Sequence, residues 1–204
     1  MLKTNKKIIL ASASPRRKEL LKKIFNEFEI LVSSVDEAKI GAKTPKEFAV
    51  KAAIAKALDI ASKSKNSTII GADTIVVLGN NILGKPKGEK DAFDMLRSLS
   101  GTTHEVITGI AVVDPDTLKV YSDFEVTKVT MKKLTDEQIS DYIATGKPMD
   151  KAGAYGIQEL GDPFIENIEG DYDNVVGLPV GKLKELISNF QCPISNGGIA
   201  SRFF

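Results

Sequence analysis

One apolar β-run constrains the fold of this chain more than any other segment. Residues 68–78 are rich in Ile, Val and Thr and form the strongest predicted strand, and Gly79-Asn80-Asn81 offers a turn directly after it. Two more long β-runs, 105–113 and 119–132, are separated only by the turn sequence 114–116. Because so short a connection reverses the chain, these two runs are expected to be antiparallel.

Helical segments alternate with the strands. Five helices are expected from their starting signals and apolar spacing. The first begins at Pro15 and has apolar residues at helical spacing as far as Phe28, and the others span residues 45–62, 90–99, 135–145 and 179–190. Shorter strands are expected at residues 8–11, 29–33, 154–158, 164–165 and 175–176. The pattern predicts an α/β fold in which helices flank a mixed β-sheet, and not a regular doubly wound fold.

The composition limits the classes of function. The chain has 204 residues, 42% of them hydrophobic, which suits one substantial domain, or one domain with two lobes around a cleft. We expect this domain to span 1–192 and a flexible tail to span 193–204. A formal net charge of +1 gives no global field for polymeric nucleic acid. The single Cys192 excludes an intramolecular disulfide. No membrane-spanning or signal segment is evident, so a cytoplasmic location is expected.

A Ser-Pro turn followed by two arginines is the first candidate site. Ser12, Ser14, Arg16 and Arg17 lie where a short strand meets the start of a helix. Backbone N–H groups and guanidinium groups at such a point suit phosphate oxygens. An ordinary capped helix with two solvated arginines would give the same pattern.

Two lysines are also candidates for phosphate binding. Lys56 lies on a helix face made otherwise of Ala52, Ala53 and Ile60, where a lysine either extends to solvent or has an anionic partner. Lys85 precedes a proline, which favours an extended backbone and could direct the side chain at a cleft, although such a tripeptide is also a common turn.

Carboxylates supply the complementary chemistry. Asp73 interrupts the strand over 68–78, and an ionised carboxylate there is unfavourable without a partner. Together with Glu37, and with Asp36 beside it, Asp73 could hold a divalent cation against phosphates. His104 is the only histidine, which excludes a multi-histidine metal site and favours a structural role. Gln158 could read the edge of a base.

In this order, the segments resemble the Maf family of nucleoside triphosphate pyrophosphatases. The resemblance runs from residue 10 to about residue 179 and depends on residues 10–17, 35–37, 47–56, 71–74, 84–86, 99–104, 150–158 and 176–179. No single segment is decisive, but their ordered combination is highly specific.

The resemblance implies the following expectations. The fold would be a mixed sheet with two lobes around a central nucleotide-binding cleft, often in a homodimer, and the reaction would release pyrophosphate by cleavage between the α and β phosphates with Mg²⁺ or Mn²⁺. Ala72-Asp73-Thr74 and Ala154-Tyr155-Gly156-Ile157-Gln158 are similar to the branch that acts on dTTP and UTP. One alternative is a nucleotide-binding regulator of septum formation in which hydrolysis is secondary, and another is a pyrophosphatase that prefers a different or a modified base.

The family's functional positions fall on eight candidate residues, and Thr74 is added to them as a candidate for selecting the base. Asp73, Lys85 and Glu37 would be catalytic, and Glu37 and Asp73 would also hold the metal. Substrate would be bound by Ser12, Arg16, Arg17, Lys56, Thr74 and Gln158.

Overall fold

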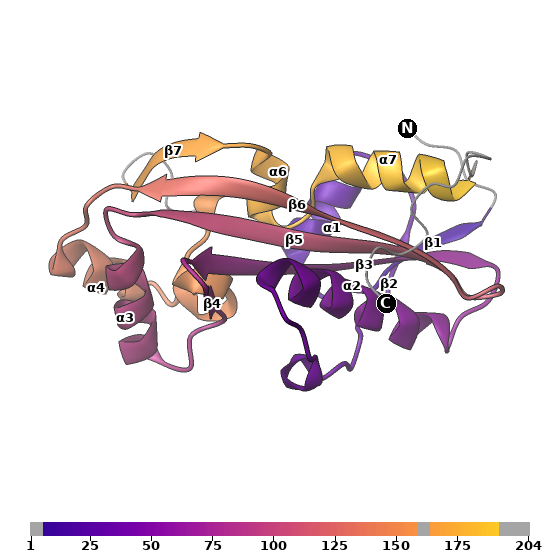
Figure 1. Ribbon diagram of the computed structural model, residues 1–204, viewed down its shortest axis with the longest axis horizontal. Coiled ribbons are helices and arrows are strands. Elements are labelled where there is room, and N and C mark those ends of the chain that lie inside the picture. The colour runs from indigo at the N-terminus through magenta and orange to yellow at the C-terminus, as the bar shows by residue number, and fades with distance from the viewer. Residues whose placement is uncertain (1–5, 159–163, 192–204) are drawn as a thin grey trace. The chain divides into compact units, whose positions relative to one another are not determined.

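A mixed seven-stranded sheet forms the framework of the protein. The structure is a computed structural model that describes residues 6–158 and 164–191 (Figure 1). The strands lie in the order β2 (Glu29–Ile30), β1 (Lys7–Leu10), β3 (Ser67–Leu78), β5 (Thr103–Asp114), β6 (Lys119–Met131) and β7 (Ile165–Glu169), and β4 (Asn81–Leu83) pairs with β3. β1 is parallel to β2 and β3, whereas β4 is antiparallel to β3 and β7 to β6. The predicted α/β class with a mixed sheet is confirmed.

The chain divides into two compact units. The first comprises Met1–Asp73, Thr108–Glu125 and Gly177–Phe204, and the second comprises Thr74–Ile107 and Val126–Val176. The helices of the first unit are α1 (Pro15–Leu21), the 3₁₀ turn η1 (Glu37–Lys39), α2 (Pro45–Ala61) and α7 (Val180–Gln191). Those of the second are α3 (Glu89–Leu99), α4 (Asp136–Ala144), η2 (Lys147–Asp150), η3 (Ala152–Ala154) and α6 (Tyr172–Val176).

In the first unit, α2 packs closely on one face of the sheet because small residues lie where the helix and the strands approach most closely. A Cβ atom on Gly71 of β3 would lie 2.2 Å from the carbonyl oxygen of Ala53, and one on Gly109 of β5 would lie 2.2 Å from that of Ala49. Glycine at these two strand positions therefore lets the helix backbone approach the sheet. The core formed here also includes Ile69 of β3.

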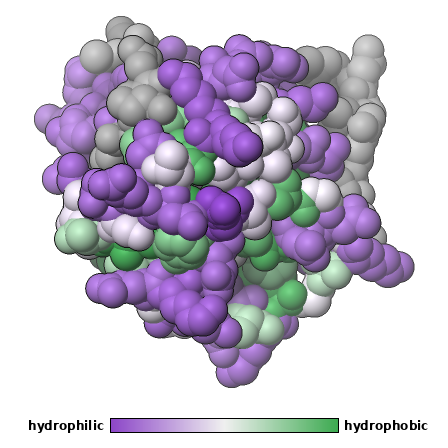
Figure 2. All heavy atoms as spheres, turned by 90° about the vertical axis from the view of Figure 1, so that its left-hand side faces the viewer, coloured by the Kyte–Doolittle hydropathy of each residue, from purple (hydrophilic) through white to green (hydrophobic). Residues whose placement is uncertain are grey.

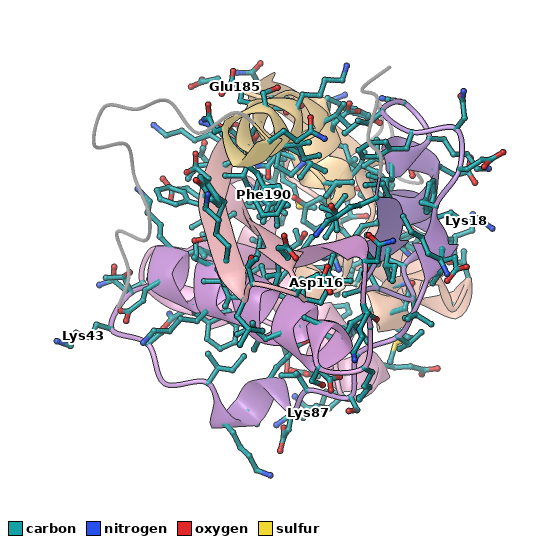
Figure 3. The ribbon with its side chains drawn as sticks, turned by 90° about the vertical axis from the view of Figure 1, so that its right-hand side faces the viewer. Lys18, Lys43, Lys87, Asp116, Glu185 and Phe190 are labelled. Carbon is teal, nitrogen blue, oxygen red and sulfur yellow. The ribbon has the colours of Figure 1, made fainter. Side chains whose placement is uncertain are left out.

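Helix α7 covers the opposite face of the sheet in this unit (Figures 1 and 3). Phe190, near its end, points inward, and its ring meets that of Tyr121 on β6 edge-to-face with the ring centroids 5.5 Å apart. The aromatic pair thus attaches the end of the last helix to the sheet.

The second unit has its own hydrophobic core. Side chains of α3, α4, β5 and β6 meet in one cluster, which Tyr155 and Ala154 complete. The exposed sides of α3 and α4 are polar, and the face shown in Figure 2 is largely hydrophilic.

All five predicted helices form, and their starting signals act as expected. Ser14 and Thr44 cap α1 and α2, and Thr135 and Gln138 form a reciprocal capping box at α4. Helix α1 ends at Leu21, however, although the helical spacing of apolar residues continues beyond it in the sequence. No helix in the described part of the chain is long and apolar enough to cross a membrane.

Three predicted strands are wrong in part or in full. β2 covers only residues 29–30 because its parallel partner β1 ends at Leu10, whose carbonyl accepts the last bond, from the N–H of Leu31. Residues 154–158 do not form a strand, since Gly153 and Ala154 have left-handed backbone angles. Residues 175–176 lie in helix α6.

Candidate functional site

The turn after β1 is organised by side-chain hydrogen bonds. The hydroxyl of Ser14 accepts from the N–H of Arg17 at 3.4 Å and caps α1. The buried hydroxyl of Ser12 accepts from the N–H of Ser14 at 3.2 Å and from Nη1 of Arg17 at 3.2 Å. Nε of Arg17 donates to the carbonyl oxygen of Gly177 at 2.9 Å. Arg17 therefore links the turn to the segment that precedes α7.

Arg17 and Lys18, which are neighbours on α1, face different environments. Lys18 projects to solvent (Figure 3), whereas burial lowers the pKa of Arg17 from its ordinary value, and the charge of Asp73 acts against this shift. Arg17 remains a cation, since a guanidinium does not lose its proton in proteins. Because α1 has only 7 residues, the expected anion binding at this turn depends on the arginine side chains more than on the helix terminus.

Lys56, Asp73 and Glu37 form a charged cluster in the same unit. Nζ of Lys56 lies 2.6 Å from Oδ1 of Asp73 and 2.6 Å from Oε1 of Glu37. The side chains of Asp73 and Lys56 are only 7% and 13% exposed, whereas that of Glu37 is 49% exposed. Of the two explanations for a lysine on this helix face, the structure supports the anionic partner.

The packing of α2 on β3 explains why these groups meet. Residues two apart on a strand share a face, so Asp73 projects on the same side as Gly71, towards α2. Ala53, Lys56 and Ala57 share one face of α2, and Gly71 contacts the first and last of them. The small residues thus bring the helix close enough for Lys56 to reach the carboxylate.

The second oxygen of Asp73 is the feature of this cluster that points to a ligand. Oδ2 is buried and has no hydrogen-bond partner in the described structure. A buried carboxylate oxygen without a donor is costly, and a divalent cation or a water molecule would relieve that cost. No group of three or more His, Cys, Asp or Glu residues that could hold a metal occurs among the described residues. A cation bound mainly by nucleotide phosphates needs only one or two carboxylates, so Glu37 and Asp73 fit such a cation.

The other candidates lie in the second unit. Thr74 is half-buried on β3, while Lys85 and Gln158 are exposed. The carbonyl oxygen of Gly84 accepts a hydrogen bond from the N–H of Gly153 at 3.0 Å, so the loop that carries Lys85 is joined to the segment that leads to Gln158.

A buried pair in the second unit was not anticipated from the sequence. Nε2 of His104 lies 2.7 Å from the hydroxyl of Tyr155, and the two rings meet edge-to-face. Burial lowers the pKa of His104 to about 4 and raises the pKa of Tyr155, so both are neutral at pH 7. The structural role expected for His104 agrees with this environment. The sequence showed only that His104 is the single histidine. It did not show that the partner of His104 is Tyr155, 51 positions away.

Comparison with known proteins identifies the relatives of the chain. The family model described as Maf-like protein matches residues 7–190. The dTTP/UTP pyrophosphatase of Alkaliphilus metalliredigens (strain QYMF) is 54% identical over 182 residues, which cover 89% of this chain and 94% of that protein. The dTTP/UTP pyrophosphatase of Clostridioides difficile (strain 630) is 46% identical over 183 residues, with coverages of 90% and 94%.

Among solved structures, the Ham1 protein of Staphylococcus aureus is similar with a TM-score of 0.49 and 15% identity, over 91% of this chain and all 100% of that one. A likeness of this strength carries no argument about function.

Proposed function

The chain belongs to the family of Maf-like proteins, and we propose that it is a nucleoside triphosphate pyrophosphatase that hydrolyses dTTP and UTP to the monophosphate and pyrophosphate. The observation that carries this proposal is the buried carboxylate of Asp73, held by Lys56 through Oδ1 while Oδ2 has no partner in the described structure. A protein that only binds nucleotides has no use for a buried carboxylate oxygen that can act on water.

The cations have the role of binding the triphosphate. Arg16, Arg17, Lys56 and Lys85 supply charge that offsets the charge developing on the leaving pyrophosphate. Arg17 also fixes the turn, through Ser12 and Gly177, which places Arg16 beside it on α1. Replacing Lys85 by alanine is expected to lower the rate by about 10²–10³, the usual cost of losing one positioned charge-stabilising group.

Asp73 acts on the attacking water. The water oxygen forms a bond to the α-phosphorus, the bond from that phosphorus to the bridging oxygen breaks, and pyrophosphate leaves with the electron pair. If Oδ2 of Asp73 serves as the base, it accepts the proton that the water loses. Lys56 orients the carboxylate through its contact with Oδ1.

A divalent cation, Mg²⁺ or Mn²⁺, completes the proposal. Glu37 and Asp73 would hold it, and when bound it would neutralise phosphate charge and lower the pKa of a water molecule. Oδ2 of Asp73 can serve as metal ligand or as base, and the two roles differ in one measurable quantity. A ligand role predicts that Asp73→Asn raises the metal concentration needed for half-maximal activity, whereas a base role predicts a lower kcat at saturating metal.

The remaining roles concern the nucleoside. Arg16, Thr74 and Gln158 would choose the base, a pyrimidine. The reaction would remove unwanted nucleotides from the pool, and it would do so in the cytoplasm, where that pool is found. The expected assembly is a homodimer.

Pyrophosphate release tests the proposal. We would measure it from dTTP, UTP, CTP, GTP and 7-methyl-GTP with Mg²⁺ or Mn²⁺, for the wild type and Asp73→Asn. Activity on dTTP and UTP that falls by about 10³ in the variant is expected. Asp94→Asn is the matched control, because Asp94 also pairs with a lysine, Lys90, but on the exposed surface of α3. Nucleotide binding without pyrophosphate from any substrate would instead favour the regulator of septum formation.

A further inference from the structure

We propose that His104 is a positioning residue that acts through Tyr155 to hold residues 152–158, and with them the loop of Lys85, in the conformation the reaction needs. The inference rests on the proposed function in so far as Lys85 and Gln158 bind the substrate. The link from His104 to these segments is a property of the second unit itself and can be tested separately.

The hydrogen bond between His104 and Tyr155 is the first step of the argument. His104 is 2% exposed, and its Nε2 atom lies 2.7 Å from the hydroxyl of Tyr155, while Nδ1 has no hydrogen-bond partner in the described structure. A buried imidazole with one polar contact fills a core less favourably than an apolar ring of similar size. The side chain therefore matters for the one bond that it makes.

That bond ends on a segment with an unfavourable backbone conformation. Gly153 and Ala154 have φ angles of +67° and +59°. The left-handed conformation is unfavourable for alanine and persists only where the surroundings impose it. Tyr155 follows directly, with its ring in the core of the second unit. Its hydroxyl is thus well placed to hold the segment in this conformation.

Two backbone bonds extend the effect to both candidate substrate groups. The N–H of Gly153 donates to the carbonyl oxygen of Gly84 at 3.0 Å, directly before Lys85. The N–H of Gly156 donates to the hydroxyl of Tyr142 at 3.3 Å, two residues before Gln158. A shift of Tyr155 is therefore transmitted in one direction to Lys85 and in the other to Gln158.

The test removes one atom. Tyr155→Phe keeps the ring in the core and loses the bond to His104. The expected result is a 10- to 100-fold lower kcat/KM for dTTP, the range typical of slight misplacement of reacting groups, together with weaker discrimination between dTTP and dCTP. Hydrogen exchange should become faster in residues 152–158 and in 84–86. His104→Leu should lower kcat/KM and speed hydrogen exchange in the same way. His104→Gln, whose amide can still bond to Tyr155, should keep most of the wild-type activity and protection from exchange.

Ser100→Ala is the matched control. The hydroxyl of Ser100 accepts from the N–H of Leu134 at 2.7 Å in the same unit and has no bond to the segment, so its loss removes a comparable bond without affecting the activity. In the background of Gln158→Ala, the added effect of Tyr155→Phe on base discrimination should disappear, because the group it positions is gone.

The outcomes separate the two proposals. If the wild type releases no pyrophosphate, the proposed function fails, and the exchange measurement alone decides whether His104 holds the segment. If Tyr155→Phe leaves the kinetics and the exchange of both segments at wild-type values, or affects them no more than Ser100→Ala does, the positioning role is overturned.

Discussion

The cluster of Glu37, Lys56 and Asp73 in the first unit and the pair of His104 and Tyr155 in the second both contain buried polar side chains. The first joins side chains of opposite charge, whereas the second is neutral. The ionised cluster is stable because each carboxylate is paired with the same ammonium group. In the neutral pair, burial itself keeps the imidazole uncharged. A buried polar group can thus be accommodated by supplying a counter-charge or by suppressing the charge. The first arrangement suits groups that act on phosphate and water, and the second suits groups that hold a segment in place.

The largest effect is expected when the counter-charge is removed. Lys56→Met leaves the carboxylate of Asp73 buried without its cation, which should lower the free energy of unfolding by about 3–5 kcal/mol in urea denaturation. Adding Asp73→Asn should recover much of this loss without restoring activity, because the amide carries no charge to be compensated.

Lys63→Met is the control for that measurement. Lys63 pairs with Asp59 at 2.6 Å, but its side chain is 57% exposed, so its loss should change stability by no more than about 1 kcal/mol. Equal losses for Lys56→Met and Lys63→Met would show that the buried pair contributes no more than an exposed one.

The neutral pair of His104 and Tyr155 should make the free energy of unfolding depend on pH. The pKa of His104 is lowered by burial from 6.5 to about 4, so between these values the unfolded chain binds a proton that the folded protein does not. The contribution is present above about pH 6.5 and is lost as the pH falls to 4, by about 3 kcal/mol in total.

This pH effect can be measured by difference. Because carboxylates titrate in the same range, the fall in unfolding free energy from pH 7 to pH 4 is compared between the wild type and His104→Gln. The wild type should lose about 3 kcal/mol more than the variant. Parallel pH profiles would mean that the imidazole protonates equally well in the folded state.

The smallest effect tests how the ionised cluster is assembled. In Gly71→Ala, the new Cβ would lie 2.2 Å from the carbonyl oxygen of Ala53, so α2 must move away from β3. We expect a loss of about 1–3 kcal/mol in stability, with lower activity because Lys56 moves with the helix. In Gly41→Ala the new Cβ meets nothing within 4 Å, and this variant should behave as the wild type. If Gly71→Ala lowers the stability but leaves the activity unchanged, the activity does not depend on how closely α2 packs on β3.

Much of the fold was predictable because its signals are local. Ser14, Thr44 and Thr135 mark helix starts, and each acts within three residues of its own position. The long strands follow from runs of β-branched residues. The errors occurred where the local pattern was overridden. β2 is limited by the length of its neighbour β1, and residues 175–176 have β-branched side chains yet lie in α6.

The candidate site was predictable in its chemistry but not in its connections. Asp73 interrupts an apolar strand and Lys56 lies among small residues of a helix, so the sequence indicated that each needed a partner. The structure pairs the two residues with each other. No pattern in the sequence indicated that Arg17 would bond to the carbonyl of Gly177, 160 positions later, or that His104 would meet Tyr155.

The sequence by itself determined most of the segments that become strands and helices, where the helices begin, and which residue types are available for phosphate and metal chemistry. The tertiary structure alone decided which of these groups meet, which are buried, and therefore which are charged. The reason is physical: hydrogen bonds along a helix or a turn depend on neighbouring residues, whereas burial and ion pairing depend on residues that only folding brings together.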